Sequence, residues 1–341
     1  MKPLLDVQNI YTYFYTESGV VEALDGVSFD VYPGEPVGIV GESGCGKTVT
    51  AHSTLRILPK NGRTVAGKIF YKGIDLLQLP ETQMRRIRGK EIAMIFQDPM
   101  TSLNPIFRID DQMTEVISLH RGVDRREALE IAIEMLEAVG IPDAAQRIHD
   151  YPHQFSGGMR QRILIARALA LQPSLLIADE PTTALDVTIQ AQVLEIIKEM
   201  QKRFGLALML ITHNLGVVAE ITRRVHIFYG GRVVESGPTE DIFLDPKHPY
   251  TRALFDSIPS LEKDKTRLET IPGNVPRLIN PPKGCRFHPR CKYATEICRR
   301  ERPPDVWIGE KRRVACHHFE ELDLHIGEEE IRERVQIKEE T

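Results

Sequence analysis

The chain opens with short apolar stretches whose alternation with polar residues predicts strands. Residues 4–14 are rich in aromatic and β-branched side chains, and Val27, Phe29 and Val31 alternate with polar neighbours as in a half-buried strand. A continuously apolar run follows at 37–40, and a helical stretch comes after it. We therefore expect two antiparallel strands, followed by a buried strand that leads into a helix.

The period becomes helical in the middle of the chain. Between 111 and 150 an apolar stripe recurs at helical spacing, with a capping-box pattern at Asp124 and Glu127 ahead of it and Gly140 at its end. This segment predicts a helical insertion whose stripe packs in the core. The other periodic segments predict strands at 68–71, 92–96, 174–180 and 206–212 and helices at 48–58 and 188–203. Strands alternating with helices predict an α/β fold.

Composition narrows the class of protein. With 341 residues, 42% of them hydrophobic, the chain can form one large α/β domain with an appendage, and disorder of the whole is excluded. The net charge of −4 gives no general attraction to nucleic acid or anionic lipid. No apolar run approaches the roughly 20 residues of a membrane span, and the first residues lack a signal-peptide core. We expect a cytoplasmic chain that meets a membrane only through a partner.

The segment 41–48 reads G-x-x-x-x-G-K-T, directly after an apolar run. In this pattern glycines let several N–H groups point at one anion, Lys47 neutralises the outer phosphates and the Thr48 hydroxyl reaches Mg²⁺. A helix that begins at Gly46 or Lys47 would add its positive dipole end. A chance match in a glycine-rich turn is the alternative, and the position between strand and helix favours nucleotide binding. The expected nucleotide contacts here are Gly41, Ser43, Gly44, Cys45, Gly46, Lys47, Thr48 and Val49.

Polar residues also follow several of the later strands. Asp179 and Glu180 end the run 174–180, where Asp179 suits the Mg²⁺ shell and Glu180 suits a general base that orients water. Solvated turn acids are the alternative. Gln97 and His213 end two further strands, and open α/β sheets place ligands at such ends. A lone histidine is usually structural, but this position favours a phosphate-contacting or water-orienting role.

Two further segments are candidates for nucleotide contact. Ser156 can cap the helix that follows, and Gly157 and Gly158 leave N–H groups accessible at its positive end, which together form a second anion site. A plain helix cap is the alternative for Ser156. Phe14 or its neighbour Tyr13 could stack on a purine, with a core or edge-strand aromatic as the alternative.

Four of the five cysteines lie in one C-terminal segment with the spacing C-x5-C-x6-C-x17-C. In a chain without a secretion signal, such a cluster favours a metal or iron–sulfur site over disulfides. The absence of a C-x2-C pair weakens the prediction of a zinc site without excluding it. Four thiolates can equally well bind a 4Fe-4S cluster. Unligated thiols or disulfides are a third alternative. These cysteines are Cys285, Cys291, Cys298 and Cys316, and an acidic tail that we expect to be solvated follows His318.

Together, these residues resemble the ATP-binding cassette (ABC) ATPases over residues 4–240. In that family's terms, the motifs are Walker A at 41–48, the Q-loop at Gln97, the signature at 156–161, Walker B at 175–180, the D-loop at 183–186 and the switch histidine at His213. The resemblance implies that Phe14, with Tyr13 as the alternative, stacks on adenine. It also implies Mg²⁺ ligation by Thr48, Gln97 and Asp179. Phe155 and Met159 depart from the general signature, and neither change removes Ser156 or the glycines.

Four segments are similar to the dipeptide and oligopeptide importer ATPases, namely 97–105, 155–162, 178–190 and 248–253. This resemblance implies an ATP-hydrolysing energy-coupling subunit at the cytoplasmic face of the cell membrane, peripheral to it. The implied partners are transmembrane permease subunits and, indirectly, an extracytoplasmic peptide-binding protein, with no nucleic acid. The four-cysteine segment is similar to one for which a 4Fe-4S cluster is the implied ligand, with Zn²⁺ as the alternative.

In this family two ATPase subunits face each other head to tail. The resemblance implies that Ser156, Gly157 and Gly158 of one subunit close the ATP site of the other. Asp186 of the D-loop is a further expected nucleotide-binding residue. A related, non-identical second subunit is expected, and a homodimer is the alternative. ATP would cement the dimer and change the facing of the permease, and hydrolysis with Glu180 as base would reset it.

The predicted fold is therefore a P-loop NTPase of the ABC ATPase type. It comprises an ATPase domain at 1–245, with an antiparallel β subdomain and a helical subdomain at about 105–170, and an extension at 246–341. The extension is expected to begin with a connector over 246–282, which is rich in proline and polar residues, and to continue with the cysteine-rich metal-cluster region and acidic tail. Alternative functions are the same role for another small solute, such as a metal ion or glutathione, and a soluble nucleic-acid-associated ABC ATPase. Proteins of the latter kind usually hold two cassettes, whereas this sequence shows one phosphate loop and one signature.

Overall fold

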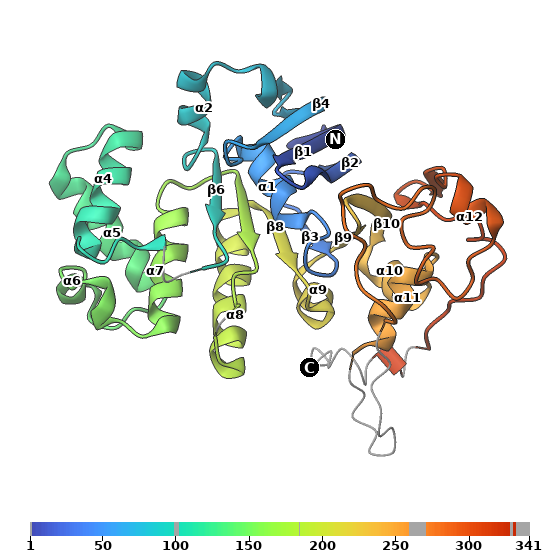
Figure 1. The fold of residues 1–341 in the computed structure, drawn as a ribbon. Helices are drawn as coiled ribbons and strands as arrows, with labels where there is room; N and C mark the ends of the chain where they lie inside the picture. The colour runs from blue at the N-terminus through green and yellow to red at the C-terminus, as the bar shows by residue number, and fades with distance from the viewer. Residues whose placement is uncertain (1, 99–101, 184, 259–270, 328–329, 332–341) are drawn as a thin grey trace. The chain divides into compact units, whose positions relative to one another are not determined.

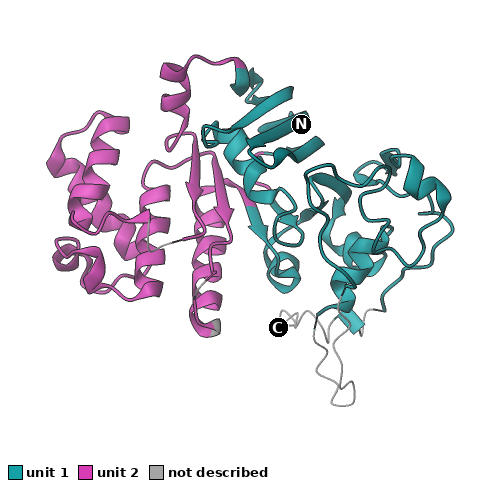
Figure 2. Ribbon diagram, viewed as in Figure 1, with its two compact units in different colours: residues 1–32, 36–77, 210–341 teal, residues 33–35, 78–209 magenta. Residues whose placement is uncertain are grey.

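The computed structural model describes residues 2–98, 102–183, 185–258, 271–327 and 330–331. Two compact units divide the chain (Figure 2): unit 1 takes residues 1–32, 36–77 and 210–341, and unit 2 takes residues 33–35 and 78–209. Most of the predicted acidic tail, Ala184 of the predicted D-loop, 99–101 of the Q-loop segment and 259–270 of the connector lie outside the described residues. The division at 245 predicted from the sequence stays a prediction.

An antiparallel sheet forms the first part of unit 1, as predicted. Its strands lie in the order β2-β1-β4-β5, with bounds Gly19–Val31, Leu5–Thr16, Gly62–Tyr71 and Ile74–Asp75. Val27, Phe29 and Val31 are buried and their neighbours are half-buried, which confirms the predicted alternation. The buried Thr12 hydroxyl lies 3.0 Å from that of Ser53 in helix α1 (Lys47–Leu55), so β1 packs against that helix.

The second sheet of unit 1 joins the start of the chain to its C-terminal part. Strand β3 (Pro36–Val40) pairs in parallel with β9 (Arg224–Tyr229). Antiparallel pairings then continue the order β9-β10-β12-β11, with bounds Arg232–Pro238, Arg312–Val314 and Val306–Ile308 for the last three. The C-terminal hairpin therefore extends the sheet that carries the phosphate loop.

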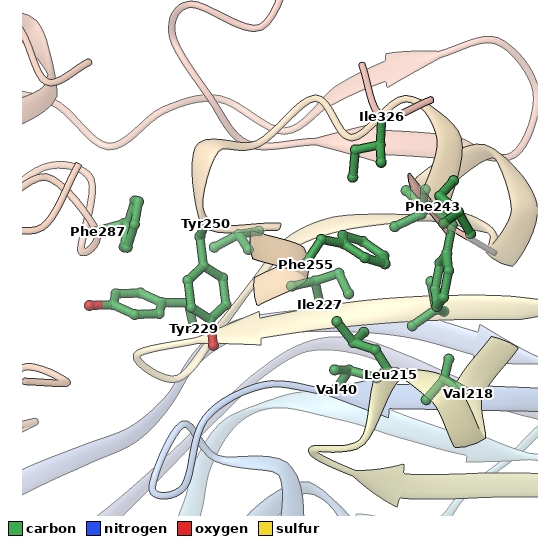
Figure 3. Close-up of a cluster of buried hydrophobic side chains, with 14 residues drawn as sticks. Val40, Leu215, Val218, Ile227, Tyr229, Phe243, Tyr250, Phe255, Phe287 and Ile326 are labelled. Carbon is green, nitrogen blue, oxygen red and sulfur yellow. The ribbon is translucent and has the colours of Figure 1, made fainter. Parts of the chain in front are cut away.

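One hydrophobic core unites these parts of unit 1 (Figure 3). The Tyr229 ring lies 4.5 Å from that of Tyr250 and 5.1 Å from that of Phe287, between centroids. The helices that contribute to this core are α9 (Leu215–Ile221), α10 (Thr239–Leu244) and α11 (Pro249–Asp256). Helix α12 (Glu296–Arg300) follows in the cysteine segment. This core is shared by residues from β3, α9, β9, β10, α10, α11 and the cysteine segment, so described parts of the extension pack into the core of the sheet that carries the phosphate loop.

Helix α11 corrects one prediction from the sequence. We expected a connector over 246–282, but its first part is helical because His248 caps the helix and Pro249 occupies the first turn. The Nδ1 atom of His248 accepts a hydrogen bond from the backbone N–H of Tyr250 at 3.0 Å. The fully buried Glu235 of β10 accepts from the N–H groups of Lys247 and His248 at 2.7 and 3.0 Å. These bonds fix the start of α11 on the sheet.

Unit 2 carries the helical insertion and the second group of strands (Figure 1). Strand β6 (Ile92–Ile95) pairs in parallel with β7 (Leu175–Asp179), as predicted. Strand β8 (Ala207–Thr212) begins in this unit, where Ala207 N–H donates to the Ser174 carbonyl. Asp124 caps its helix as predicted, through a 2.9 Å bond from Glu127 N–H. The helices are α2 (Glu81–Ile87), α4 (Ile109–Arg121), α5 (Arg125–Ala138), α6 (Ala144–Arg147), α7 (Gly157–Leu169) and α8 (Val187–Phe204).

Across the residues that the structure describes, no helix combines the length and the apolar character needed to cross a membrane.

His226 of β9 gives unit 1 a pH-dependent stability. Burial, followed by the positive charges of Arg224 and Arg313, lowers its pKa well below the ordinary value of 6.5, and its ring lies 5.2 Å from that of Phe29. Because the unfolded chain binds this proton more readily, stability is complete above about pH 6.5 and falls as the pH drops towards the native pKa. We expect a loss of up to about 1.4 kcal/mol per pH unit below pH 6 from this residue.

Urea unfolding at pH 5 to 7.5 measures how much His226 contributes to the pH dependence of the free energy of unfolding. His226→Leu should flatten the dependence of the free energy of unfolding on pH, because the variant has no imidazole to protonate. His325→Ala, at an exposed position, is the control and should keep the wild-type dependence. Equal slopes for His226→Leu and wild type would contradict the assignment.

Candidate functional site

The phosphate loop of unit 1 is held by close backbone packing. A Cβ atom at Gly41 would overlap the carbonyl oxygen of Phe228, and one at Gly46 would lie 2.8 Å from the carbonyl oxygen of Ala23. Gly46 also has a φ of 105°, in the left-handed region that favours glycine. The Cys45 carbonyl accepts a 2.9 Å bond from Gly231 N–H. Both glycines are therefore required by the fold of the loop itself.

The start of helix α1 lies where the sequence predicted it. The helix begins at Lys47, and Gly46 at the cap position brings no side-chain acceptor to its first N–H groups. The Lys47 ammonium is buried and donates to the carbonyls of Gly41 and Glu42 at 2.7 and 3.0 Å. This places its positive charge inside the loop, among backbone N–H groups suited to a phosphate. Of the other predicted contacts, Ser43 and Gly44 are exposed and Thr48 and Val49 are half-buried.

Cys45 has a packing role in the loop. It is 1% exposed, and burial raises the pKa of its thiol. Its Sγ lies 3.9 Å from the Lys47 ammonium.

Unit 1 holds three further residues that the sequence predicted to contact the nucleotide, namely two aromatic side chains of β1 and one histidine. Phe14 is half-buried, and its ring lies beside Gly62 of β4, where an added Cβ would come within 2.7 Å of it. Tyr13 is also half-buried, and burial together with Glu22 raises its pKa. His213 is exposed just after β8, ahead of Asn214, which caps α9.

Unit 2 brings together three polar side chains at the ends of β6 and β7. Gln97 Nε2 and Thr183 Oγ1 each donate to Glu180 Oε2 at 2.9 Å. Two donors on one oxygen fix the rotamer of the Glu180 carboxylate. The backbone of Glu180 has a φ of 44°, a strained conformation for a residue with a side chain. Asp179 beside it is 1% exposed.

The signature segment opens helix α7 as predicted. The Ser156 hydroxyl accepts from Met159 N–H at 3.3 Å, which confirms the helix cap. A Cβ at Gly158 would lie 2.6 Å from the Cγ2 of Ile189 in α8, so this glycine also allows two helices to pack closely. Gln161 Nε2 donates to the Pro181 carbonyl at 2.7 Å and ties α7 to the turn after Glu180. Asp186 is exposed at the cap position of α8, without a side-chain cap bond.

The four C-terminal cysteines converge in unit 1. Cys285, Cys291, Cys298 and Cys316 are free thiols that line one pocket of about 20 Å³. Burial, with the neighbouring thiols adding to it, raises the pKa of Cys291 to about 11 and that of Cys316 to about 12. Among the described residues, no group of three or more Cys, His, Asp or Glu side chains is arranged to hold a metal ion. The structure therefore brings the four thiols to one pocket but does not show the predicted metal-cluster site.

Comparison with known families decides the class. Residues 24–183 match the family described as ABC transporter, and residues 234–298 match the family described as the oligopeptide/dipeptide transporter C-terminal region. The dipeptide transport ATP-binding protein DppD of Bacillus subtilis is 48% identical over 317 residues, which cover 93% of this chain and 95% of the relative. The chain belongs to the ABC transporter family.

Other relatives of this ABC protein are similar along most of their length. The oligopeptide transport ATP-binding protein OppD of Haemophilus influenzae is 50% identical over 87% of this chain and 92% of its own. A Sinorhizobium fredii protein, named as a probable peptide ABC transporter ATP-binding protein, is 53% identical over 94% of this chain and 96% of its own.

Solved structures agree with the predicted fold of the ABC protein. A dimeric ATP-binding cassette with bound ADP and Pi has a TM-score of 0.62, at 24% identity over 69% of this chain and 98% of that one. The ABC ATPase P-loop fold, with its antiparallel sheet and helical part, is therefore confirmed. The ABC protein is an ATPase, and its family implies ATP and Mg²⁺.

Sequence reasoning missed the second role of Gly158 and the partners of Glu42. Glu42 occupies a variable position of the phosphate loop, yet Arg290 pairs with its carboxylate at 2.6 Å. The contact between Gly158 and Ile189 and the contact between Glu42 and Arg290 each join residues far apart in the chain. No periodic pattern in the sequence predicts either of them. In the sequence, the position of Arg290 directly before Cys291 was the one signal of a role for this arginine.

Replacement of Gly158 tests its packing role. Gly158→Ala places a methyl group against Ile189, and overpacking of this kind costs about 1–3 kcal/mol of stability. Ile189→Ala removes the opposing Cγ2, so the double variant should be less destabilised than the sum of the two single changes. Urea unfolding of the four proteins gives this double-mutant cycle. Strict additivity would show that the two positions do not meet.

Proposed function

We propose that this ABC protein is the energy-coupling ATPase subunit of a peptide importer. The observation that carries the proposal is the match of residues 234–298 to the oligopeptide/dipeptide transporter C-terminal region. The matched segment builds β10, α11 and part of the core of unit 1, so it belongs to the body that holds the phosphate loop. The names of relatives such as OppD and DppD, at about half identity, support oligopeptides and dipeptides as the substrate class over a metal ion or glutathione.

In the proposed reaction, the loop N–H groups, the first turn of α1 and Lys47 bind the phosphates of ATP. Phe14, or Tyr13, stacks on the adenine ring. Mg²⁺, held by Thr48, Gln97 and Asp179, would neutralise developing charge on the phosphates.

Glu180 acts as the general base in this proposal. Its carboxylate accepts a proton from the attacking water, and the bonds from Gln97 and Thr183 hold it in one orientation. His213 contacts the terminal phosphate or orients the water. The supporting observation is the geometry around Glu180, where two neutral donors fix the carboxylate without adding a countercharge.

A second ATPase subunit completes each ATP site in this proposal. Ser156, Gly157 and Gly158 would present the start of α7 to ATP on the other subunit, together with Asp186. The exposure of Ser156 and of Asp186 supports this use. The partner is a related chain, with a second copy as the alternative. Through the permease, the pair works at the cytoplasmic face of the membrane and receives peptide from an extracytoplasmic binding protein.

We propose further that the four cysteines hold a 4Fe-4S cluster. They line one pocket, and His318 N–H points at the Cys316 sulfur at 3.4 Å, as donors to metal-bound thiolates do. Zinc is the weaker alternative, because no pair of these cysteines has the C-x2-C spacing of common zinc sites. A cluster would join the segment 285–316 covalently, and its role is structural.

The function is tested by one substitution. Glu180→Gln keeps the shape of the side chain but removes the base, so MgATP binding should remain while turnover falls at least about 100-fold. In cells with a disrupted copy of the gene, wild type should restore uptake of labelled short peptides and Glu180→Gln should not. Glu195→Gln on the exposed face of α8 is the matched control and should restore uptake.

Two results would contradict the proposal. One is near-normal hydrolysis by Glu180→Gln. The other is a disrupted strain that takes up peptides normally and loses uptake of a metal ion or glutathione.

The cluster is tested by anaerobic purification. The protein should be brown and hold about four iron atoms per chain. Cys291→Ser should lower the iron content, whereas Cys45→Ser should keep it, because Cys45 lies in the phosphate loop. A colourless protein with one zinc ion per chain would refute the cluster.

A further inference from the structure

Arg290, directly before Cys291, is an almost fully buried cation. Its side chain is 4% exposed and forms a two-pronged ion pair with Glu42, at 2.6 Å between Nη1 and Oε2 and 3.0 Å between Nη2 and Oε1. Its Nε donates to the Pro272 carbonyl at 2.8 Å, and Nη2 also donates to the Ile271 carbonyl at 3.2 Å. A paired fork of this kind is geometrically specific, and lysine cannot reproduce it.

Glu42 is the second residue of the phosphate loop, and the loop is held at this residue from three directions. Arg290 binds its carboxylate, its backbone N–H donates to Tyr250 Oη at 2.9 Å, and its carbonyl accepts from Lys47 at 3.0 Å. The phosphate-loop motif does not require a carboxylate at this position. The side chain of Glu42 thus connects the loop to the cysteine segment, through the cation that would otherwise be buried alone.

A second arginine fixes the other end of the same cysteine loop. Arg286, directly after Cys285, pairs with Glu22 at 2.7 Å and Asp25 at 2.8 Å and donates to the Gly230 carbonyl. The next residue, Gly231, donates its N–H to Cys45 of the phosphate loop. Within unit 1, the loop 285–291 therefore contacts the phosphate loop directly through Arg290 and Glu42, and indirectly through the turn at Gly230 and Gly231.

Phe287 lies between the two arginines and anchors the loop in the core. It is 2% exposed, and its ring lies 5.1 Å from that of Tyr229 and 5.3 Å from that of Tyr250 (Figure 3). These are the tyrosines whose hydroxyls contact Arg290 and Glu42, at 3.4 and 2.9 Å. The packing of Phe287 and the ion pair therefore act on the same two residues, Arg290 and Glu42.

We propose that Arg290 is a positioning residue for the ATPase reaction. Through Glu42 it holds the phosphate-loop backbone and Lys47 in the geometry that binds phosphate, and it neutralises a carboxylate that would otherwise repel the nucleotide. The conformation of the loop 285–291 then sets the affinity for MgATP. This inference rests on the proposed ATP site.

Nucleotide affinity in the Glu180→Gln background, where hydrolysis does not interfere, tests the proposal. Arg290→Ala should weaken binding of MgATP and MgADP about 10-fold or more. The nucleotide affinity of Arg290→Lys should lie between that of Arg290→Ala and that of the parent protein, because an ammonium group keeps the positive charge but cannot form the two-pronged ion pair. The double variant Glu42→Gln, Arg290→Ala should regain part of the nucleotide affinity that Arg290→Ala loses, because it no longer has an unpaired carboxylate in the loop. Arg300→Ala is the control, since Arg300 pairs with Glu296 inside α12.

Hydrogen exchange separates positioning from general stabilisation. Because coupling is reciprocal, MgADP should slow amide exchange in 285–291 of the Arg300→Ala control and not in Arg290→Ala. If Arg290→Ala does not fold, Arg290→Lys carries the same two measurements.

Wild-type nucleotide affinity in Arg290→Ala, or in Arg290→Lys when it stands in, would overturn the proposal. So would equal protection of 285–291 by MgADP in that variant and in the control. A parent Glu180→Gln protein that binds no nucleotide would instead contradict the proposed ATP site. The two failures are therefore distinguishable.

Discussion

The whole of unit 1 depends on how closely the backbone of the phosphate loop packs against its neighbours. Gly41 faces the Phe228 carbonyl and Gly46 faces Ala23, at distances that admit no side chain. Gly231 donates its N–H to Cys45, and its carbonyl accepts from Asp25 N–H at 2.9 Å. The proposed phosphate-binding loop is therefore built on β2 and on the turn between β9 and β10. Under this proposal, changes in those elements would alter nucleotide binding.

The C-terminal extension is part of this construction. Its strands β11 and β12 continue the sheet of β3, its aromatic side chains enter the same core, and its arginines pair with Glu22, Asp25 and Glu42. In a small segment with little core of its own, a cross-link among four cysteines would preserve this arrangement. In the proposed arrangement, the loop 285–291 of the cysteine segment contacts the phosphate loop through the ion pair between Arg290 and Glu42.

Local signals predicted most of the local structure. The phosphate-loop motif located the start of α1 at Lys47, the capping pattern located Asp124, and continuous apolar runs located the parallel strands β6 and β7. Long-range pairings were beyond such signals: Arg290 and Glu42 are 248 residues apart, and nothing in the local pattern of either selects the other. Helix α11 was missed because its proline-rich surroundings resembled a connector. The cysteine spacing predicted convergence, whereas the bound group depends on chemistry that spacing does not encode.

If the ATPase drives peptide transport, its rate of ATP hydrolysis depends on whether peptide is supplied, and this dependence can be measured. The most direct measurement is the rate of ATP hydrolysis of the protein purified together with its permease, with the binding protein added either peptide-loaded or empty. We predict that the peptide-loaded binding protein raises the rate well above that given by the empty form. A rate that peptide does not change, and that a metal ion, glutathione or nucleic acid raises instead, would contradict the account.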